Sequence, residues 1–284
     1  MNRHDFLKGV HARYQPRSYL EIGVKNGRSL ALSRVPSVGI DPAFAISFEL
    51  ECDVRLVRDT SDNFFAREDP VGHLPHKRVD FGFIDGMHLF EYAFRDFINV
   101  EALSHPGSVV ILDDMLPRSV DEAARGGKGS GSWAGDVYKV GLVLAKHRPD
   151  LLCVPVDTLP TGTLLVLGVD PSNTTLRDNY DAIEAEFAAD DPQDVPAEIL
   201  ERSQARDPEA LLASPVWDKL RALCDAGAST AEVREMLAGL ALPAPVEQSI
   251  IKSEGGAPKP AKPKKKAPPA RKQGSGRRGL LRRR

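Results

Sequence analysis

Short apolar runs alternate with stretches of helical character through the first 170 residues. The predicted strands are residues 18–24, 38–41, 55–57, 79–85, 108–113, 151–156 and 163–169. This alternation is typical of a parallel sheet covered by helices. The last two strands are joined by DTLPTG, which is too short for a crossover helix, so we expect an antiparallel hairpin. The pattern predicts an α/β fold: a doubly wound, mostly parallel seven-stranded sheet that ends in this hairpin.

The chain changes character after the last predicted strand. Between residues 178 and 209, eleven acidic residues accompany only two basic ones, Arg202 and Arg206. Further on, SPVWDKLRALCDAG and STAEVREMLAGLA predict two amphipathic helices, with Ser229 and Glu232 as a capping box for the second. We therefore expect residues 1–171 to form one domain and residues 172–250 to form a small, acidic helical appendage.

The charge of the chain is divided very unevenly. Residues 252–284 contain 13 Lys and Arg and one acidic residue, whereas the other 251 residues contain 25 basic and 39 acidic residues. The segment 251–284 is rich in Lys, Arg, Pro and Ala, and it has too little apolar surface to offset its ordering entropy. We expect a disordered basic tail that contacts a polyanion, such as nucleic acid or an anionic surface, without sequence specificity.

The cysteine positions and the hydropathy of the chain indicate the cellular compartment in which the protein is expected. Cys52, Cys153 and Cys224 lie far apart without a CxxC pair, which argues against a disulfide framework and fits a reducing environment. No apolar run approaches 18 residues, and the first residues lack the apolar core of a signal peptide. We expect a cytoplasmic protein without a transmembrane segment. The sequence carries no pattern that indicates an oligomeric state.

The first strand leads into a glycine turn that predicts a cofactor. In YLEIGVKNGRS, Gly23 and Gly27 allow a tight turn and close approach of the backbone to a ligand. Asp41 ends the second strand, where a carboxylate can accept two hydrogen bonds from a ribose. The glycine spacing differs from a dinucleotide fingerprint, and Glu21 would repel a pyrophosphate but not the cationic end of S-adenosylmethionine.

Two neighbouring strands end in acids. Asp85 and His88 follow the fourth strand in DFGFIDGMH, and Asp113 and Asp114 follow the fifth in SVVILDDM. Three carboxylates at one edge of a sheet raise one another's pKa unless a cation compensates them, and all-oxygen ligation suits Mg²⁺ or Mn²⁺. Each residue alone has a structural explanation, such as a turn or a helix cap. Their occurrence together with the glycine turn favours a functional site.

The motifs YLEIGVKNGRS, GIDP, FIDGMH and VVILDD, in this order and spacing, resemble class I S-adenosylmethionine-dependent methyltransferases over residues 15–170. Within that class they resemble the metal-dependent O-methyltransferases that include macrolide-sugar enzymes and the related cephalosporin hydroxylase. The resemblance implies a Rossmann-like methyltransferase fold and an O-methyltransferase that uses S-adenosylmethionine. It also implies a small-molecule hydroxyl acceptor, a sugar or other polyol.

The resemblance also implies roles for individual residues. Glu21 and Gly23 would line the methionine end of the cofactor, Asp41 would hold its ribose, and Thr60 or Ser61 would contact its adenine. The other expected cofactor residues are Gly27, Ser29 and Asp85. The metal, Mg²⁺ or Mn²⁺, would be bound by Asp85, Asp113 and Asp114, although the family commonly has Glu where this chain has Asp113. His88 would be the general base that takes the proton of the acceptor hydroxyl.

Two other functions are compatible with the sequence. A hydroxylase-like relative would keep the fold and the metal but change the chemistry. A polyanion-binding protein would use the domain only as a scaffold, which the basic tail favours and the intact set of acids disfavours. The loop 126–135 is rich in glycine, and Trp133 is its only large apolar residue. If the protein is a methyltransferase or a hydroxylase, we expect this loop to form a lid over the substrate.

Overall fold

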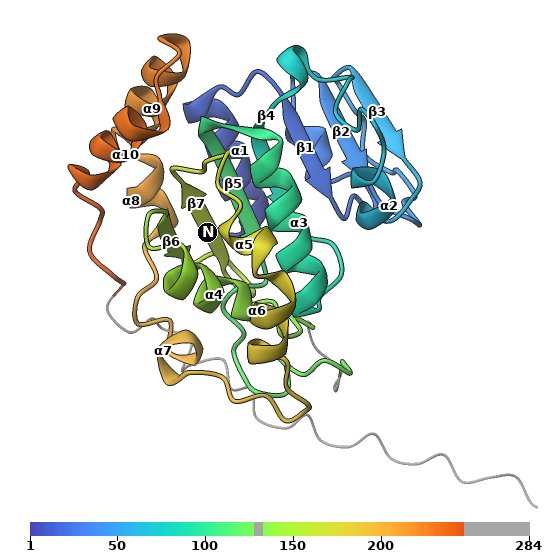
Figure 1. Cartoon of the computed structure of the whole chain (residues 1–284), viewed down its shortest axis with the longest axis vertical. Helices are drawn as coiled ribbons and strands as arrows, with labels where there is room; N and C mark the ends of the chain where they lie inside the picture. The colour runs from blue at the N-terminus through green and yellow to red at the C-terminus, as the bar shows by residue number, and fades with distance from the viewer. Residues whose placement is uncertain (128–132, 247–284) are drawn as a thin grey trace, which may run out of the picture. The chain divides into compact units, whose positions relative to one another are not determined.

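The computed structural model of the chain describes residues 1–127 and 133–246. Within them it confirms a seven-stranded sheet in the order β3-β2-β1-β4-β5-β7-β6 (Figure 1). The strands are β1 (Tyr19–Ile22), β2 (Ser37–Ile40), β3 (Val54–Val57), β4 (Val79–Ile84), β5 (Ser104–Asp113), β6 (Leu152–Val156) and β7 (Thr163–Leu167). Strands β1 to β5 pair in parallel, and β7 runs antiparallel to both of its neighbours. The predicted hairpin is therefore confirmed.

The register of the sheet aligns the ends of its central strands. Ile22 of β1 pairs with Ile40 of β2 and Ile84 of β4, and Ile84 pairs in turn with Leu112 of β5. These residues are buried because the central strands have helices on both faces. The residues that follow them therefore emerge at one edge of the sheet, its carboxyl edge. These residues include Gly23, Asp41, Asp85, Asp113 and Asp114.

One face of the sheet is covered by α3 (Phe90–Ala102) and α4 (Lys139–His147), with α5 (Thr175–Asp178) and α6 (Tyr180–Phe187) nearby (Figure 1). Phe90, Phe94 and Phe97 repeat at helical spacing on α3 and are buried in the same core as Leu112 of β5. The short helix α2 (Ser61–Phe65) packs beside α3. This layer holds the start of α3, and with it His88, close to the carboxyl edge.

The opposite face is covered by helices from both ends of the chain. Helix α1 (Arg3–Tyr14) packs beside α8 (Pro208–Leu212) and α9 (Val216–Asp225), and α10 (Thr230–Ala238) packs on α9. Phe6 and Trp217 are buried in one core with Phe81 and Phe83 of β4. The predicted amphipathic helices are thus α9 and α10, and the capping box of Ser229 with α10 is present.

The helices after β7 share both cores with the sheet, so the described residues form one compact unit. The predicted division of the chain at residue 172 stays a prediction. The remaining short helices are α7 (Ala197–Leu200), η1 (Leu30–Leu32) and η2 (Pro75–Lys77). Among the described residues, every helix is too short or too polar to cross a membrane.

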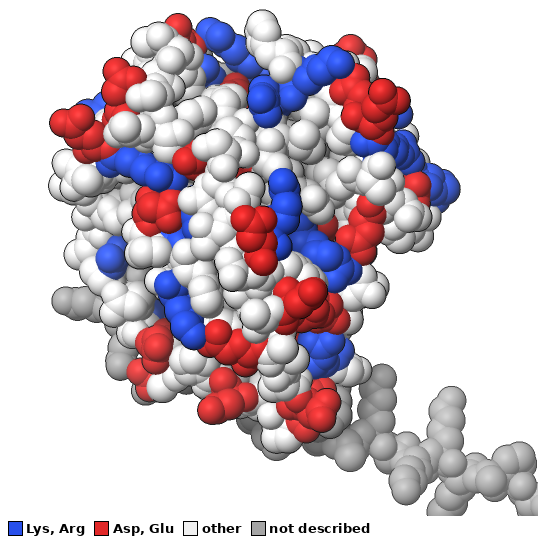
Figure 2. Space-filling model, viewed as in Figure 1, with Lys and Arg blue, Asp and Glu red and all other residues white. Residues whose placement is uncertain are grey.

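Two sequence predictions fall on residues that the structure leaves out. The basic tail 251–284 lies outside the described residues, and so does half of the proposed lid, residues 128–132. Figure 2 shows basic and acidic side chains interspersed over the visible face of the described part. Polyanion contact through the tail therefore stays a prediction.

Candidate active site

The glycine turn after β1 is shaped by two residues with positive φ. Gly23 has φ +90° and Gly27 has φ +83°, conformations that favour glycine. A Cβ atom at Gly23 would lie 1.8 Å from the carbonyl oxygen of Asp85, so only glycine fits between β1 and β4 there. The amide of Gly23 donates to the carbonyl of Ile40, at 2.8 Å. The turn after β1 therefore packs directly against the backbone that follows β4.

Asp41 holds the glycine turn against the end of β2. One carboxylate oxygen accepts from the amide of Lys25 at 2.7 Å, and the other accepts from the amide of Ala43 at 2.6 Å. Each oxygen retains a second acceptor position, and the residue is only half-buried. The geometry leaves this carboxylate able to accept hydrogen bonds from a diol.

Glu21 lies beneath the turn and is almost fully buried, at 1% exposure. Its carboxyl group accepts a hydrogen bond from the Tyr19 hydroxyl at 2.7 Å. Burial raises the pKa of Glu21 to about 8, against the opposing effect of the hydrogen bond from Tyr19. The group is therefore mainly protonated at neutral pH, and a cationic ligand beside it would favour its ionised form.

The three predicted hydroxyl residues lie near the same edge. Ser29 is buried immediately before η1. Thr60 is the N-cap of α2 and accepts from the amide of Asn63 at 3.3 Å. Ser61, the first residue of α2, hydrogen-bonds to the carboxyl of Asp96, whose pKa is raised by burial to about 7.

The structure brings His88 together with two of the three predicted metal ligands. Ligand atoms of Asp85, His88 and Asp114 lie within 4.8 Å of one another. Nε2 of His88 is 3.4 Å from Oδ1 of Asp85 and 3.1 Å from Oδ2 of Asp114. Asp114 has φ +62° and accepts a hydrogen bond from the Thr161 hydroxyl. Asp113 lies outside this group.

Arg3 is a member of the site that the sequence did not reveal. Its guanidinium Nη1 lies 3.2 Å from the Asp85 carboxylate and also forms an ion pair with Asp113. Arg3 begins α1, a helix that the sequence analysis did not predict. The N-cap residue Asn2, whose side chain accepts from the amide of Asp5, is a local signal that could have located the start of this helix.

His88 is held by the residues that end the glycine-rich loop. Its Nδ1 is 2.6 Å from the carbonyl oxygen of Trp133, so Nδ1 carries the hydrogen and Nε2 faces the acids. The rings of His88 and Trp133 are 5.1 Å apart, and a Cβ atom at Gly135 would lie 1.7 Å from the carbonyl oxygen of His88. The described end of the predicted lid is therefore in contact with the imidazole.

The electrostatics of the site favour a protonated imidazole. Burial lowers the pKa of His88, but the hydrogen bond to Asp85 and the charges of Asp114 and Asp85 outweigh this effect and raise it to about 9. Burial raises the pKa of Asp114 to about 6. The carboxylates at this edge thus attract positive charge, here supplied by His88 and Arg3.

The donor set fits a divalent cation. The Asp85 and Asp114 carboxylates are hard oxygen ligands, which suit Mg²⁺ or Mn²⁺, and Nε2 of His88 lies beside both of them. These residues line one small pocket together with Gly86, Met115 and Val137. Since Asp113 is paired with Arg3, it would join them only by releasing that contact.

Comparisons with known proteins found one family match and several similar solved structures. The family described as "Methyltransferase domain" matches residues 20–115, which contain every predicted cofactor, metal and catalytic residue. The O-methyltransferase from Bacillus cereus, solved in complex with SAH, is 18% identical. The match covers 58% of this chain and 79% of that protein's chain, with a TM-score of 0.42. TomG from Streptomyces achromogenes, an O-methyltransferase of tomaymycin synthesis solved with SAM, is 21% identical. The match covers 58% of this chain and 78% of TomG, with a TM-score of 0.42. No curated protein matches.

Proposed function

We propose that this chain, an S-adenosylmethionine-dependent class I methyltransferase by its sheet and its family match, methylates a hydroxyl of a small acceptor, a sugar or polyol. His88 is the general base in this proposal, and Mg²⁺ or Mn²⁺ is held by Asp85 and Asp114. The observation that carries the proposal is the meeting of these three residues beside the glycine turn of β1. The hydroxylase-like alternative would use the same edge for other chemistry.

The cofactor would lie over the glycine turn. Gly23 lets the turn after β1 pack against the backbone of Asp85, and the methionine end of the cofactor would lie beside this turn. The buried Glu21 carboxyl would become charged beside the cofactor's ammonium group. The free acceptor positions of Asp41 would bind the ribose hydroxyls. Thr60 and Ser61 would contact the adenine from the start of α2.

A cation at Asp85 and Asp114 would neutralise these carboxylates and lower the pKa of the acceptor hydroxyl. Arg3 places a positive charge beside the acids at the ends of β4 and β5. When the cation binds, the Asp85 carboxylate would either contact both Arg3 and the cation or lose its contact with Arg3. We propose that Asp113 is the third carboxylate of the site once Arg3 has moved. This arrangement explains why a buried edge of the sheet carries three acids.

His88 is oriented for proton transfer by its contact with the lid residue Trp133. The carbonyl of Trp133 holds the Nδ1 hydrogen, so Nε2 is the atom that accepts the proton of the acceptor. When the carboxylates are neutralised, they no longer raise the pKa of His88. His88 would then be free to take the proton of the acceptor hydroxyl at neutral pH. S-adenosylmethionine, held beside the glycine turn, would supply the methyl group to that oxygen and leave as S-adenosylhomocysteine.

Calorimetry with S-adenosylmethionine, first in EDTA and then with Mg²⁺, tests the two parts of the site separately. We expect cofactor binding in both conditions and a Mg²⁺ signal that Asp114→Asn abolishes. Methyl transfer from labelled cofactor to a panel of sugars should fall about 10²- to 10⁴-fold in His88→Gln. The exposed His76 provides the control variant, His76→Gln. Undiminished metal-dependent transfer in Asp114→Asn would contradict the proposed centre.

A further inference from the structure

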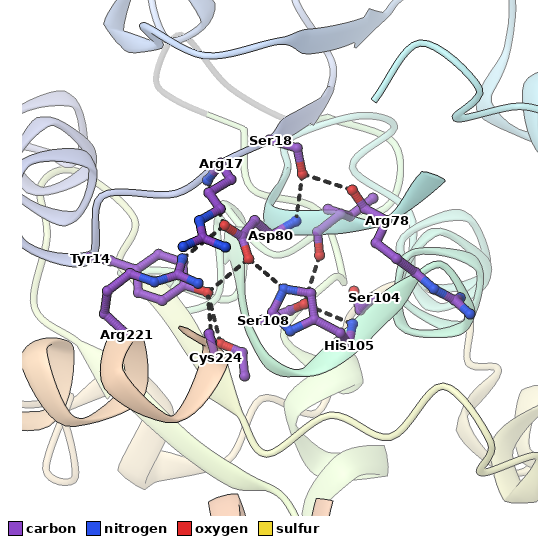
Figure 3. A network of polar contacts seen from close by, with 12 residues as sticks. Tyr14, Arg17, Ser18, Arg78, Asp80, Ser104, His105, Ser108, Arg221 and Cys224 are labelled. Carbon is purple, nitrogen blue, oxygen red and sulfur yellow. Dashed lines mark hydrogen bonds and ion pairs between the residues drawn. The ribbon is translucent and has the colours of Figure 1, made fainter. Parts of the chain in front are cut away.

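A second cluster of ligand-type side chains lies at the amino edge of the sheet, opposite to the active site (Figure 3). We propose that Asp80, His105 and Cys224 bind a divalent cation of the zinc type there. Asp80 lies near the start of β4, His105 near the start of β5, and Cys224 near the end of α9. The sequence did not reveal this cluster, since Cys224 is more than 100 residues from the other two.

The donor atoms are close enough to share one ion. The ligand atoms of Asp80, His105 and Cys224 all lie within 4.8 Å of one another. Zinc bonds of about 2.0–2.3 Å in tetrahedral geometry require donors roughly 3.3–3.6 Å apart. The Tyr14 hydroxyl adjoins the cluster, 3.2 Å from Oδ1 of Asp80 and 3.6 Å from Sγ of Cys224. Nε2 of His105 and Oδ1 of Asp80 are hydrogen-bonded to each other, so an ion bound by the three donors would replace this hydrogen bond.

The chemistry of the donors selects the ion. A thiolate, an imidazole and a carboxylate together favour Zn²⁺ over Mg²⁺ or Ca²⁺, which prefer oxygen ligands only. The active-site group of Asp85, His88 and Asp114 offers only oxygen and nitrogen donors. The two edges of the sheet thus differ in the kind of cation they suit.

The carboxylate of Asp80 is already oriented for this role. Its Oδ2 accepts from the amide of Arg17 at 2.5 Å and from Nη1 of Arg221 at 3.0 Å. Oδ1 is thereby turned towards Tyr14 and His105, as Figure 3 shows. Partners of this kind fix the orientation of a ligand and contribute to metal affinity.

A cavity beside the cluster provides an entry path and room for a fourth ligand. It has a volume of about 210 Å³ and is lined by His105, Gly107, Cys224 and Val233 among others. Water or a small ligand could complete the coordination from this side. Because Cys224 belongs to α9, a bound ion would also link the C-terminal helices to β4 and β5.

Cobalt titration of the full-length, metal-stripped protein tests the proposal. Thiolate ligation of Co²⁺ produces a sulfur-to-metal charge-transfer band, which the oxygen and nitrogen donors of the active site cannot produce. We expect one equivalent of Co²⁺ to give this band in the wild type and in Asp114→Asn, and Zn²⁺ to displace it. The band should be lost in Cys224→Ser and retained in Cys52→Ser, a matched half-buried cysteine outside the cluster.

Two further variants guard against a trivial loss of the fold. His105→Asn should also abolish the band, and Arg221→Met should weaken Co²⁺ binding about 10- to 100-fold, as expected for an outer-shell partner. Thermal unfolding in EDTA shows whether each variant is folded. The absence of the band in the wild type would show a metal-free hydrogen-bonded network and overturn the proposal. Persistence of the band in Cys224→Ser would overturn it as well.

Discussion

The burial of Glu21 disfavours its ionised form. Replacing it therefore tests both its effect on folding stability and its proposed role in binding the cofactor. Glutamine at this position keeps the shape of the side chain and an acceptor for the Tyr19 hydroxyl, but it cannot ionise. We expect Glu21→Gln to stabilise the folded chain at neutral pH. The same variant should bind S-adenosylmethionine more weakly, because the amide carries no charge for the cofactor's ammonium group.

The size of the stabilisation by Glu21→Gln follows from the difference in the pKa of Glu21 between the folded and the unfolded chain. The pKa of Glu21 is about 8 in the folded chain and 4.5 for an unperturbed glutamate, so the folded chain holds the proton more tightly. Its free energy of unfolding therefore falls as the pH rises from 4.5 to 8. At 1.36 kcal/mol per pKa unit, the loss is about 1 kcal/mol at pH 5, about 3 kcal/mol at pH 7 and about 4 kcal/mol at pH 8.

Urea unfolding of the cofactor-free protein in EDTA, at pH 5, 7 and 8, measures this loss directly. The stabilisation by Glu21→Gln should grow with pH by the amounts given above. Asp53→Asn is the control, because the Asp53 side chain is 77% exposed, and it should change stability by less than about 0.5 kcal/mol at every pH. If the free energy of unfolding depended on pH in the same way for the wild type and Glu21→Gln, the reasoning would be refuted. Glu21 would then have the same pKa in the folded and the unfolded chain.

Three further variants test other contacts. Arg148→Met should cost about 3–5 kcal/mol in urea unfolding because it strands the buried carboxylate of Glu101, 2.7 Å from the guanidinium, and adding Glu101→Gln should recover part of the loss. Gly23→Ala should abolish calorimetric binding of S-adenosylmethionine, whereas Gly227→Ala, at positive φ but with open space around it, should leave binding intact. Arg3→Met should tighten Mg²⁺ binding about fivefold, since a partly exposed ion pair is worth about 1 kcal/mol; unchanged affinity would show that Arg3 does not compete with the cation.

The sheet could be predicted because its signals are local. Each strand is a short apolar run, and the acids and glycines that end β1, β4 and β5 mark the carboxyl edge. Strand β5 begins four residues earlier than predicted, at Ser104, because His105 and Pro106 interrupt the apolar pattern. The sequence therefore located the edge of the candidate site better than the beginnings of its strands.

The contacts between distant segments could not be predicted. Arg3 meets the acids after β4 and β5 only because α1 packs across the sheet, and no spacing in the sequence encodes that arrangement. The buried residues Phe6, Val10 and Tyr14 do have helical spacing, but the charged residues around them obscure the pattern. The grouping of His88 with the acids was foreseen as a catalytic arrangement, whereas its contact with Trp133 arises from the fold of the loop.

Helix α1 runs across the sheet from its carboxyl edge to its amino edge, and contacts at both of its ends constrain its length. Arg3 at its start reaches Asp85 after the end of β4, and Tyr14 at its end hydrogen-bonds to Asp80 near the start of β4. Eleven helical steps cover about 16 Å, and the five strand steps between those two acids cover about the same distance. One inserted residue would turn one end by about 100° relative to the other, so both contacts could not be kept. We therefore expect substitutions on the outer side of α1 to be tolerated and a one-residue insertion to break either the Arg3 contact or the Tyr14 contact, so that the length of α1 couples the candidate active site to the Asp80 cluster.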